Sequence, residues 1–377
     1  MPNLLTERER EAELAAFAST PAGREKPGRY WKIDLESIAP AAGASAAGSV
    51  TFEGADARLT VGDLQTARRE HAALLERAFR QAVEGQHKFA HLALANAGLG
   101  AFVYVPANAQ IEEPVVVRYR AQSGETIYPY TVVLVEANAR VTVIERLELG
   151  GGAFACGVAD IVTEEGAHVT YASAQQAPED ARVLFTRVAR PGRDATVAWA
   201  TAELGAALSV CDVGVTIAQP GVDAQISTLF FPTGTQHVDI VSSVDHRSGD
   251  ATSETLVKSA AAGRGQGRYL GSIRIAPHAQ QTDASLRDDA LLLSKTAHLD
   301  SIPALEIAAN DVKAYHGATV GALDDDAIFY MTSRGIDRVA AERMIALGFF
   351  EPAIDRFPTQ ALRDEIRAAL EQKVSLQ

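Results

Sequence analysis

The middle of the chain carries a short motif that returns about every 28 residues. Each copy joins a turn-forming residue, an alanine and, two positions after the alanine, a residue that favours strands. The copies are Asn108-Ala109-Gln110-Ile111, Asn138-Ala139-Arg140-Val141, Gly166-Ala167-His168-Val169, Asp194-Ala195-Thr196-Val197 and Asp223-Ala224-Gln225-Ile226, with weaker ones at Asp250-Ala251 and His278-Ala279. A tight corner followed by a strand is what one coil of a β-solenoid needs. A period of this length predicts stacked units that bury their apolar faces against one another.

The segments between the motifs are rich in strand-forming residues and show no helical periodicity. The clearest are Val115–Tyr119, Tyr130–Glu136, Val141–Arg146, Val197–Ala200 and Tyr269–Ile275. A β-sandwich would place its turns closer together, about every 8 to 12 residues. We therefore predict a mainly β fold, a right-handed parallel β-helix over residues 96–317.

Both flanks of this core are expected to be helical. The N-terminal region, residues 1–95, offers a helix from Thr6 to Phe17 and another over Val61–Val83. The C-terminal domain, residues 318–377, begins with the capping run Asp324-Asp325-Asp326. Its first long helix has Ile336, Val339, Ala340, Met344 and Leu347 on one face and is expected to end at Gly348, and the last helix opens at Pro358 and Thr359.

Charge and composition narrow the class of protein. The 377 residues carry a formal net charge of −13, with a pI near 5.2, which argues against nucleic acid or an anionic membrane as the main partner. No basic segment followed by an apolar run marks a secretory leader, and no apolar run is long enough to span a bilayer. Two cysteines, Cys156 and Cys211, form no CxxC pair. We expect a cytoplasmic protein.

Sequence motifs for catalysis are scarce. The chain has no P-loop, GxSxG or HExxH motif, and Gly263-Arg264-Gly265-Gln266-Gly267 lacks a glycine that a dinucleotide loop requires. His87 and His91 could share a helix face, which is compatible with a metal, but without a third ligand nearby we favour a partly exposed helix surface. We expect no enzymatic activity.

His316 differs from the other histidines because it lies where the solenoid ends and the helices begin. The last coil of a solenoid exposes unpaired strand backbone, which must be capped or joined to another chain. A neutral imidazole there is placed to meet a partner and is a good ligand for iron or zinc. His316 is our candidate metal ligand.

The same part of the chain resembles the SufB/SufD family of iron–sulfur cluster assembly proteins. The matching segments are Leu299–Ile307, Asp311-Val312-Lys313, His316-Gly317-Ala318-Thr319, Phe329–Ile336 and Gly348-Phe349. Within the family the histidine motif is more similar to SufD members, since SufB members typically have Glu where Gly317 stands. The SufB-type cysteines between Leu286 and His316 are missing, and Ala314 stands where some SufD proteins have a cysteine.

The resemblance implies a non-catalytic subunit that pairs with a SufB-like paralogue through the solenoid and binds the ATPase SufC through its C-terminal helices. It also implies that His316 takes part in forming a transient iron–sulfur cluster shared with the partner, and in iron delivery. A flavin within the complex and a homodimer of the isolated chain are further expectations. The residues expected at the ATPase contact are Phe329, Tyr330, Arg334, Gly335, Ile336, Met344 and Phe349.

Two alternatives remain open at this stage. A SufB-type scaffold would fit the same fold, although the missing cysteines and Gly317 argue against it. A β-helix enzyme acting on polysaccharide would need clustered charged residues along one groove, and usually an export signal, and neither is evident.

Overall fold

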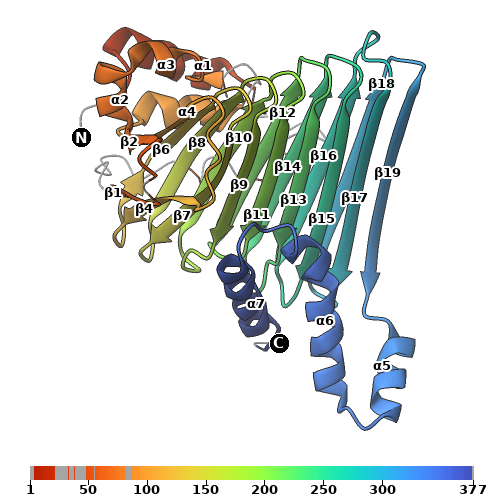
Figure 1. Ribbon diagram of the computed structural model, residues 1–377. Helices are drawn as coiled ribbons and strands as arrows, with labels where there is room; N and C mark the ends of the chain where they lie inside the picture. Colours follow the sequence, from red (N-terminus) through yellow and green to blue (C-terminus); the bar gives the residue numbers. More distant parts are fainter. Residues whose placement is uncertain are drawn as a thin grey trace.

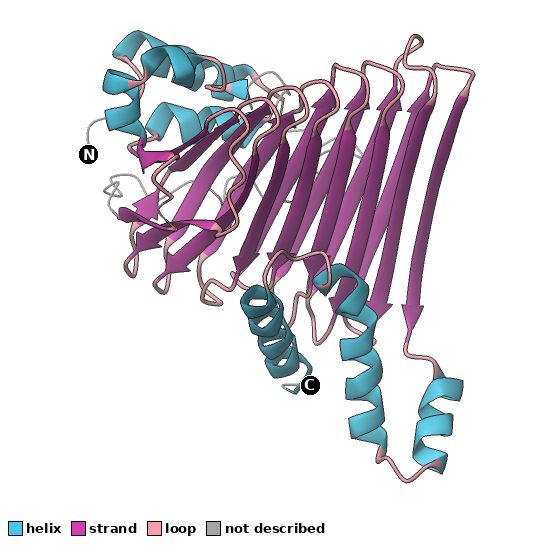
Figure 2. Cartoon of the chain, in the orientation of Figure 1, coloured by secondary structure: helices cyan, strands magenta, loops and turns pink. Residues whose placement is uncertain are grey.

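The structure is a computed structural model, and it describes residues 4–21, 33, 38, 48–54, 56–81 and 87–375. Its body is a solenoid in which the chain alternates between two facing sheets (Figures 1 and 2). Successive coils pair in parallel, and only the first strand of each sheet pairs antiparallel with its neighbour. The predicted parallel β-solenoid is confirmed.

Nine strands form one sheet, in an order that follows the coils. They are β1 (Ser49–Glu53), β4 (Val115–Ala121), β7 (Arg140–Leu149), β9 (His168–Gln175), β11 (Thr196–Glu203), β13 (Asp223–Phe230), β15 (Thr252–Ala261), β17 (Thr282–Leu292) and β19 (Val312–Ala322). The five predicted strand segments all fall within strands of the two sheets, within one residue at their ends.

The facing sheet holds the intervening strands, and its order also follows the coils. They are β2 (Thr60–Asp63), β3 (Leu99–Val105), β6 (Pro129–Val135), β8 (Phe154–Thr163), β10 (Arg182–Arg190), β12 (Leu208–Ile217), β14 (His237–His246), β16 (Gln266–Ile275) and β18 (His298–Ile307), with the short β5 (Thr126–Ile127) beside β8. Alternate residues of both sheets face the lumen, and these inward side chains stack into one continuous apolar core.

The repeated motif forms the corner that leads into the nine-stranded sheet. Asn108, Asn138 and Asp194 take left-handed backbone conformations, with φ of 64°, 58° and 53°, which asparagine and aspartate tolerate better than most residues. At the equivalent Gly166, with φ of 64°, an added Cβ would lie 2.6 Å from the Asn138 side-chain oxygen, so a larger residue there would have to displace that side chain. The alanine that follows each corner is buried.

Two of the predicted copies of the motif, Asp223-Ala224 and His278-Ala279, do not lie at the corners where the sequence pattern placed them. Strand register pairs Val197 with Ala224, so the corner equivalent to Asp194-Ala195 is Gly221-Val222 and not Asp223-Ala224. Likewise Thr252 pairs with Asp283, which places the last corner at Gln281, where φ is 58°, and not at His278-Ala279. Any buried small or β-branched residue can follow a corner, so an alanine is not a reliable marker of register.

Helices of the N-terminal region cover the outer face of the ten-stranded sheet near its start (Figure 1). They are α1 (Glu7–Ser19), α2 (Leu64–Glu70), α3 (Ala72–Glu76) and α4 (Lys88–Asn96). The predicted start at Thr6 is confirmed by a capping box between Thr6 and Glu9. The single helix predicted over Val61–Val83 is wrong, because its first residues form β2 and the helix is interrupted at His71; residues 82–86 lie outside the described part.

Three helices follow the last strand: α5 (Asp325–Ser333), α6 (Arg338–Ile354) and α7 (Gln360–Ser375). The predicted end of α6 at Gly348 is wrong. Phe350, Ala353 and Ile354 lie beyond that glycine and are buried against the outer face of the nine-stranded sheet, and this packing carries the helix onward. The outer part of α6 and all of α5 project away from the solenoid as a hairpin (Figure 1).

Candidate functional site

The last coil of the solenoid is open. Within the described strands, β18 pairs only with β16 and β19 only with β17, so each is the final strand of its sheet (Figure 1). The outer edges of these strands, of 10 and 11 residues, carry backbone N–H and C=O groups that no further coil satisfies. Long exposed edges of this kind are templates for pairing with another chain.

His316 lies in the middle of β19, on the side that faces the lumen. Strand register places it beside Leu286, a core residue that is fully buried in the coil before. Side chains in register on neighbouring strands point to the same face, so the imidazole continues the inward column of the core. No further coil covers it among the described residues, and it is exposed, with no hydrogen bond or ion pair to them. The imidazole is free to bind a ligand.

A second polar group lies one coil below. Asp288 faces the lumen in register with Ala318, two residues along β19 from His316, and it is only 1% exposed. Ser301 on β18 donates a hydrogen bond to Asp288 Oδ2, while Oδ1 has no partner among the described residues. Burial raises the pKa of Asp288 to about 7. Our sequence reasoning missed this residue, which only the strand register identifies as facing the lumen.

Large apolar side chains are exposed on both strands of the last coil. Ile307 on β18 is 44% exposed, and Val320 and Tyr315 on β19 are 48% and 61% exposed. Val320 lies in register with the buried Ala290 and therefore continues the core, whereas Tyr315 is on the opposite face of the strand. Exposed apolar residues that continue a core, such as Ile307 and Val320, are typical of a surface that becomes buried on association.

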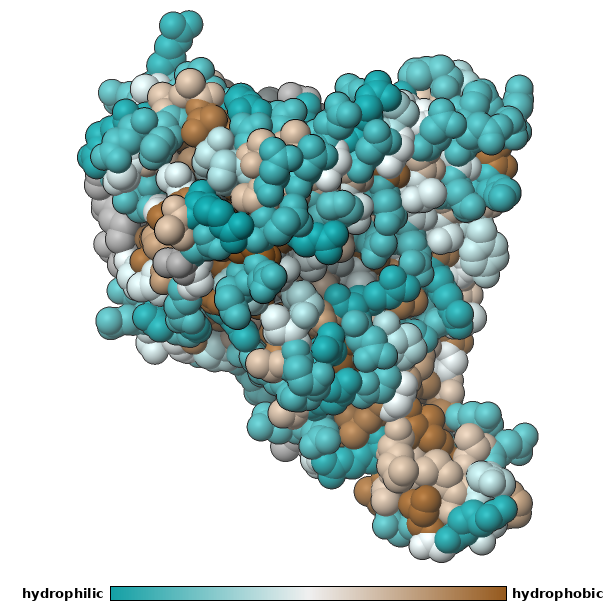
Figure 3. All heavy atoms as spheres, in the orientation of Figure 1, coloured by the Kyte–Doolittle hydropathy of each residue, from teal (hydrophilic) through white to brown (hydrophobic). Residues whose placement is uncertain are grey.

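The α5–α6 hairpin presents a second apolar surface. Phe329, Tyr330, Val339 and Met344 are 73%, 60%, 75% and 55% exposed, and Figure 3 shows apolar residues gathered on this projecting part. Gly335, with φ of 89°, forms the turn between the two helices. Val339 was not among the contact residues expected from the sequence. We find it exposed because the hairpin extends beyond the sheet that buries the base of α6.

The other expected contact residues divide between the hairpin and its base. The Arg334 guanidinium lies over the Tyr330 ring, 5.2 Å from its centroid, and Ile336 is half-buried. Phe349 lies at the base of α6, where it packs edge-on against Phe350 and the Lys258 ammonium lies 4.5 Å from its ring centroid. Phe349 is thus placed to hold the hairpin on the solenoid.

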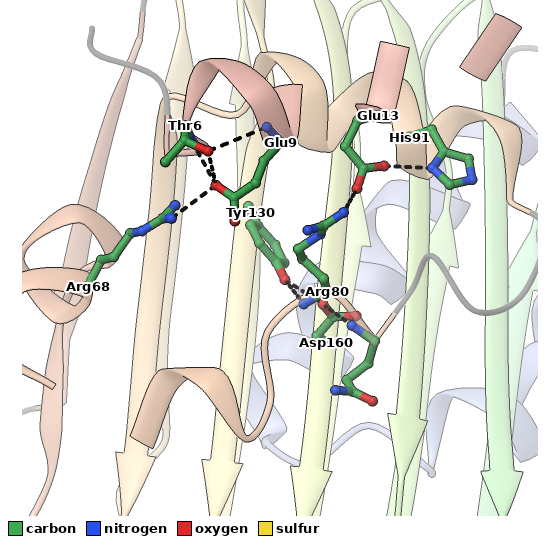
Figure 4. A network of polar contacts seen from close by, with 9 residues as sticks. Thr6, Glu9, Glu13, Arg68, Arg80, His91, Tyr130 and Asp160 are labelled. Atoms are coloured by element: carbon green, nitrogen blue, oxygen red, sulfur yellow. Dashed lines mark hydrogen bonds and ion pairs between the residues drawn. The ribbon is translucent and has the colours of Figure 1, made fainter. Parts of the chain in front are cut away.

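His87 and His91 are not on a partly exposed helix surface, as the sequence suggested. They are 3% and 9% exposed, and each pairs with a different buried carboxylate. His91 Nδ1 lies 2.6 Å from a Glu13 oxygen, and Arg80 contacts the other oxygen of the same carboxylate (Figure 4). His87 Nδ1 lies 2.8 Å from Asp212 Oδ2. These contacts attach the N-terminal helices to one another and to the sheet.

A buried ionic network inside the lumen was also missed from the sequence. Arg187 faces inward on β10 and its Nη2 lies 2.7 Å from Glu145 Oε1, while its Nη1 lies 3.9 Å from Glu203. Tyr171 donates a hydrogen bond to Glu145, and Ser209 donates one to Glu203. Burial raises the pKa of the Cys211 thiol, which lies 3.2 Å from Arg187. This network lies several coils away from the open end.

The described residues hold no cluster of three or more His, Cys, Asp or Glu side chains with the geometry of a metal site. Among the same residues, none of the helices is both long and apolar enough to cross a membrane.

Comparison with known proteins places these features in one family. Residues 117–349 match the family model described as SUF system FeS cluster assembly, SufBD core domain. The iron-sulfur cluster assembly protein SufD of Bacillus subtilis (strain 168) is 27% identical over 320 residues, which cover 83% of this chain and 73% of that protein. SufD of Escherichia coli (strain K12) is 35% identical over 150 residues, which cover 40% of this chain and 36% of that protein.

A mycobacterial relative covers both chains more evenly. The iron-sulfur cluster assembly SufBD family protein of Mycobacterium tuberculosis (strain ATCC 25618 / H37Rv) is 30% identical over 284 residues, which are 73% of this chain and 71% of that protein. The family match spans most of the solenoid, the open end with His316 and the projecting hairpin, and it favours this family over the polysaccharide enzyme considered above. The chain belongs to the SufB/SufD family of iron–sulfur cluster assembly proteins of the SUF system.

Proposed function

We propose that this chain is a SufD-like, non-catalytic subunit of a cytoplasmic SufBCD-type complex. In this role it pairs with a SufB-like paralogue through the open end of the solenoid and docks a SufC-like ATPase on the α5–α6 hairpin. The observation that carries the proposal is the position of His316, an exposed imidazole on the unpaired final strand of a member of this family.

Pairing through the open end follows from what the last coil lacks. Its exposed apolar residues Ile307 and Val320 continue the core. When another chain excludes water from them, the free energy falls by about 25 cal/mol per Å² of apolar surface buried. Its strand edges gain hydrogen-bond partners in the same event. A SufB-like chain with the same coil geometry is the natural partner, because its own last coil would present matching edges. Two copies of this chain could use the same edges, so a homodimer of the isolated chain is the competing assembly.

His316 then lies inside the interface, where it binds the iron–sulfur cluster, which is the product of the complex and not its resident cofactor. A single imidazole does not hold iron by itself, so the remaining ligands have to come from the partner. The Asp288 carboxylate, buried one coil below, adds negative charge beside the site when it is ionised, which favours a cationic metal. A flavin bound within the complex stays a prediction, and the chain alone is proposed to hold no cofactor tightly.

The hairpin supports ATPase docking by its composition and its attachment. It carries four of the eight exposed large apolar side chains among the described residues, and aromatic side chains contribute strongly to binding energy at interfaces. Phe350 and Ile354 anchor the base of α6 in the sheet. A nucleotide-driven movement of a protein bound to the hairpin would therefore be transmitted to the solenoid and to its open end.

Replacing His316 by alanine tests the proposed cluster site. We expect anaerobic cluster formation by the reconstituted complex to fall at least about tenfold, because even an outer partner of a metal ligand costs that much in affinity when it is removed. Assembly with the SufB-like and SufC-like subunits should persist, as judged by gel filtration. Iron and sulfide analysis and the visible absorption of the cluster measure the yield.

His298→Ala is the matched control, because His298 is an exposed histidine on the other strand of the same coil, paired with Asp300. This variant should keep the cluster yield of the unmodified complex. If His316→Ala leaves the cluster yield unchanged, the imidazole is not part of the cluster site.

A further inference from the structure

A pocket of about 380 Å³ lies on the outer face of the ten-stranded sheet and extends from β10 to β16, the strand next to the final strand β18. Its described lining residues come from β10, β12, β14 and β16, from Arg247 next to β14 and, on the side of the N-terminal helical layer, from Gln81 and His87. Its volume is in the range of small-molecule sites, which is about 300 to 1,000 Å³. Neither cluster assembly nor ATPase docking, as proposed above, uses this surface.

The floor of the pocket is made by small residues on neighbouring strands. Gly214, Ser243 and Ser272 lie in register on β12, β14 and β16 and line the pocket together. A Cβ added at Gly214 would lie 3.2 Å from the Ser243 hydroxyl oxygen. The glycine therefore keeps the space above the floor open. The two serines are half-buried; the Ser243 hydroxyl can donate to a bound oxygen atom, and the Ser272 hydroxyl can do so in exchange for its long, 3.5 Å hydrogen bond to the Ser242 carbonyl oxygen.

Positive charge gathers along one side of this floor. Arg190, Arg247 and Arg274 line the pocket, and Asp245 is the one acidic side chain among the described lining residues. Asp245 lies in register with Arg274 and pairs with Arg247 at 2.7 Å. With Glu306 of β18 lying beside Arg274, three guanidinium groups and two carboxylates gather at this side of the pocket, in a chain whose net charge is −13.

The guanidinium of Arg274 is available for a ligand. Its ion pair with Glu306 is long, at 3.7 Å, and both side chains are more than two-thirds exposed. Such pairs contribute little and are easily exchanged for a better partner. Arginine is the residue that recognises phosphate oxygens best, because its planar donors can bind two of them at once.

On the opposite side, the pocket is closed by a histidine in a fixed orientation. His87 precedes α4, is 3% exposed and lines the pocket. Its Nδ1 lies 2.8 Å from Asp212 Oδ2, and because a carboxylate only accepts, Nδ1 carries the proton. The buried His87–Asp212 pair gives the site a rigid wall of the kind that a preformed ligand pocket has.

We propose that this pocket binds a small molecule that carries a phosphate or diphosphate group. The arginines and serine hydroxyls bind the phosphate oxygens, and the His87 side of the pocket accommodates the rest of the molecule. This site is separate from the one that holds His316 and does not depend on the proposed role in cluster assembly.

Calorimetric titration of the full-length chain at physiological ionic strength tests this site with three probes: inorganic pyrophosphate, adenosine diphosphate and adenosine. We expect pyrophosphate and adenosine diphosphate to bind and adenosine to give no signal. Arg274→Glu should weaken both by about tenfold or more, because it removes hydrogen bonds to a charged group and places a negative charge beside the phosphate. Gly214→Val, which fills the floor, should abolish binding while the circular dichroism spectrum is unchanged.

Arg264→Glu is the matched control, because it makes the same charge change on an exposed turn that does not line the pocket. It should leave both affinities unchanged. The proposal is overturned if neither phosphate compound binds, or if Arg264→Glu weakens binding as much as Arg274→Glu does. Equal binding of adenosine would also contradict it, and so would an acidic peptide that binds this face and is not displaced by pyrophosphate.

Discussion

Phe329→Asp and Val339→Asp will each weaken capture of a SufC-like ATPase by about thirtyfold or more. Both side chains are almost three-quarters exposed on the α5–α6 hairpin. A central apolar residue of an interface typically contributes about 2 kcal/mol or more, and an aspartate in its place also buries an unpaired charge. The affinity can be measured by biolayer interferometry with the full-length chain immobilised.

The same exposure makes these two changes safe for the fold, since neither residue contacts the buried base of α6. Thermal unfolding should therefore occur within a few degrees of the unmodified chain. Leu14→Asp is the matched control, because Leu14 is an exposed leucine on α1, far from the hairpin in the sequence. If the hairpin variants capture the ATPase as well as the Leu14 variant does, the dock is elsewhere.

Arg187→Leu will lower the free energy of unfolding by about 3 to 5 kcal/mol, the range measured when one partner of a buried ion pair is removed. Arg187 and both of its carboxylate partners are at most 3% exposed, so Glu145 and Glu203 would be left in the lumen without a cation. Chemical denaturation followed by far-ultraviolet circular dichroism gives the difference in free energy.

Two further variants identify the cause of this loss. Adding Glu145→Gln and Glu203→Gln to Arg187→Leu should restore most of the stability, because an amide oxygen can still accept from Tyr171 and Ser209 without carrying a charge. Arg338→Leu, which breaks an exposed pair with Glu342, should cost less than about 1 kcal/mol. A loss of the same small size with Arg187→Leu would mean that the lumen network does not stabilise the fold.

Much of the fold could be predicted from the sequence because a solenoid repeats its local rules. Left-handed corners favour Asn, Asp or Gly, and these recur at a nearly constant spacing until the last corner, where Gln281 takes their place. Register was harder to predict. The corner at Gly221-Val222 breaks the alanine pattern, and only the pairing of Val197 with Ala224 reveals the shift. Hydrophobic periodicity does not distinguish between neighbouring positions that are both small and buried.

The helices show where local signals fail. Gly348 is a reasonable helix end by propensity, yet burial of Phe350 and Ile354 against the sheet extends α6 past it. Val339 and Met344 lie on the face that the pattern marks as apolar, but the hairpin extends beyond the solenoid and leaves them exposed. A pattern gives the face of a helix, and only tertiary structure decides whether another element covers it.

The candidate site was predictable in part. His316 was identified because it falls where the strand pattern stops, and the structure places it on the open final strand. Asp288 escaped notice because it stands beside Asp289, and the sequence gives no sign that one of these faces the lumen while the other pairs with Lys258. The His87 and Asp212 pair joins residues 125 positions apart, a contact that no local pattern predicts.

Hydrogen–deuterium exchange at the last coil tests the central claim most directly. The full-length chain should be measured alone, at a dilution where it is monomeric, and again with its SufB-like paralogue. We predict that backbone amides of β18 and β19 exchange more slowly in the mixture, while those of β4 and β7 at the other end of the solenoid are unchanged. Unchanged exchange in β18 and β19, with new protection elsewhere on the chain, would contradict pairing through the open end.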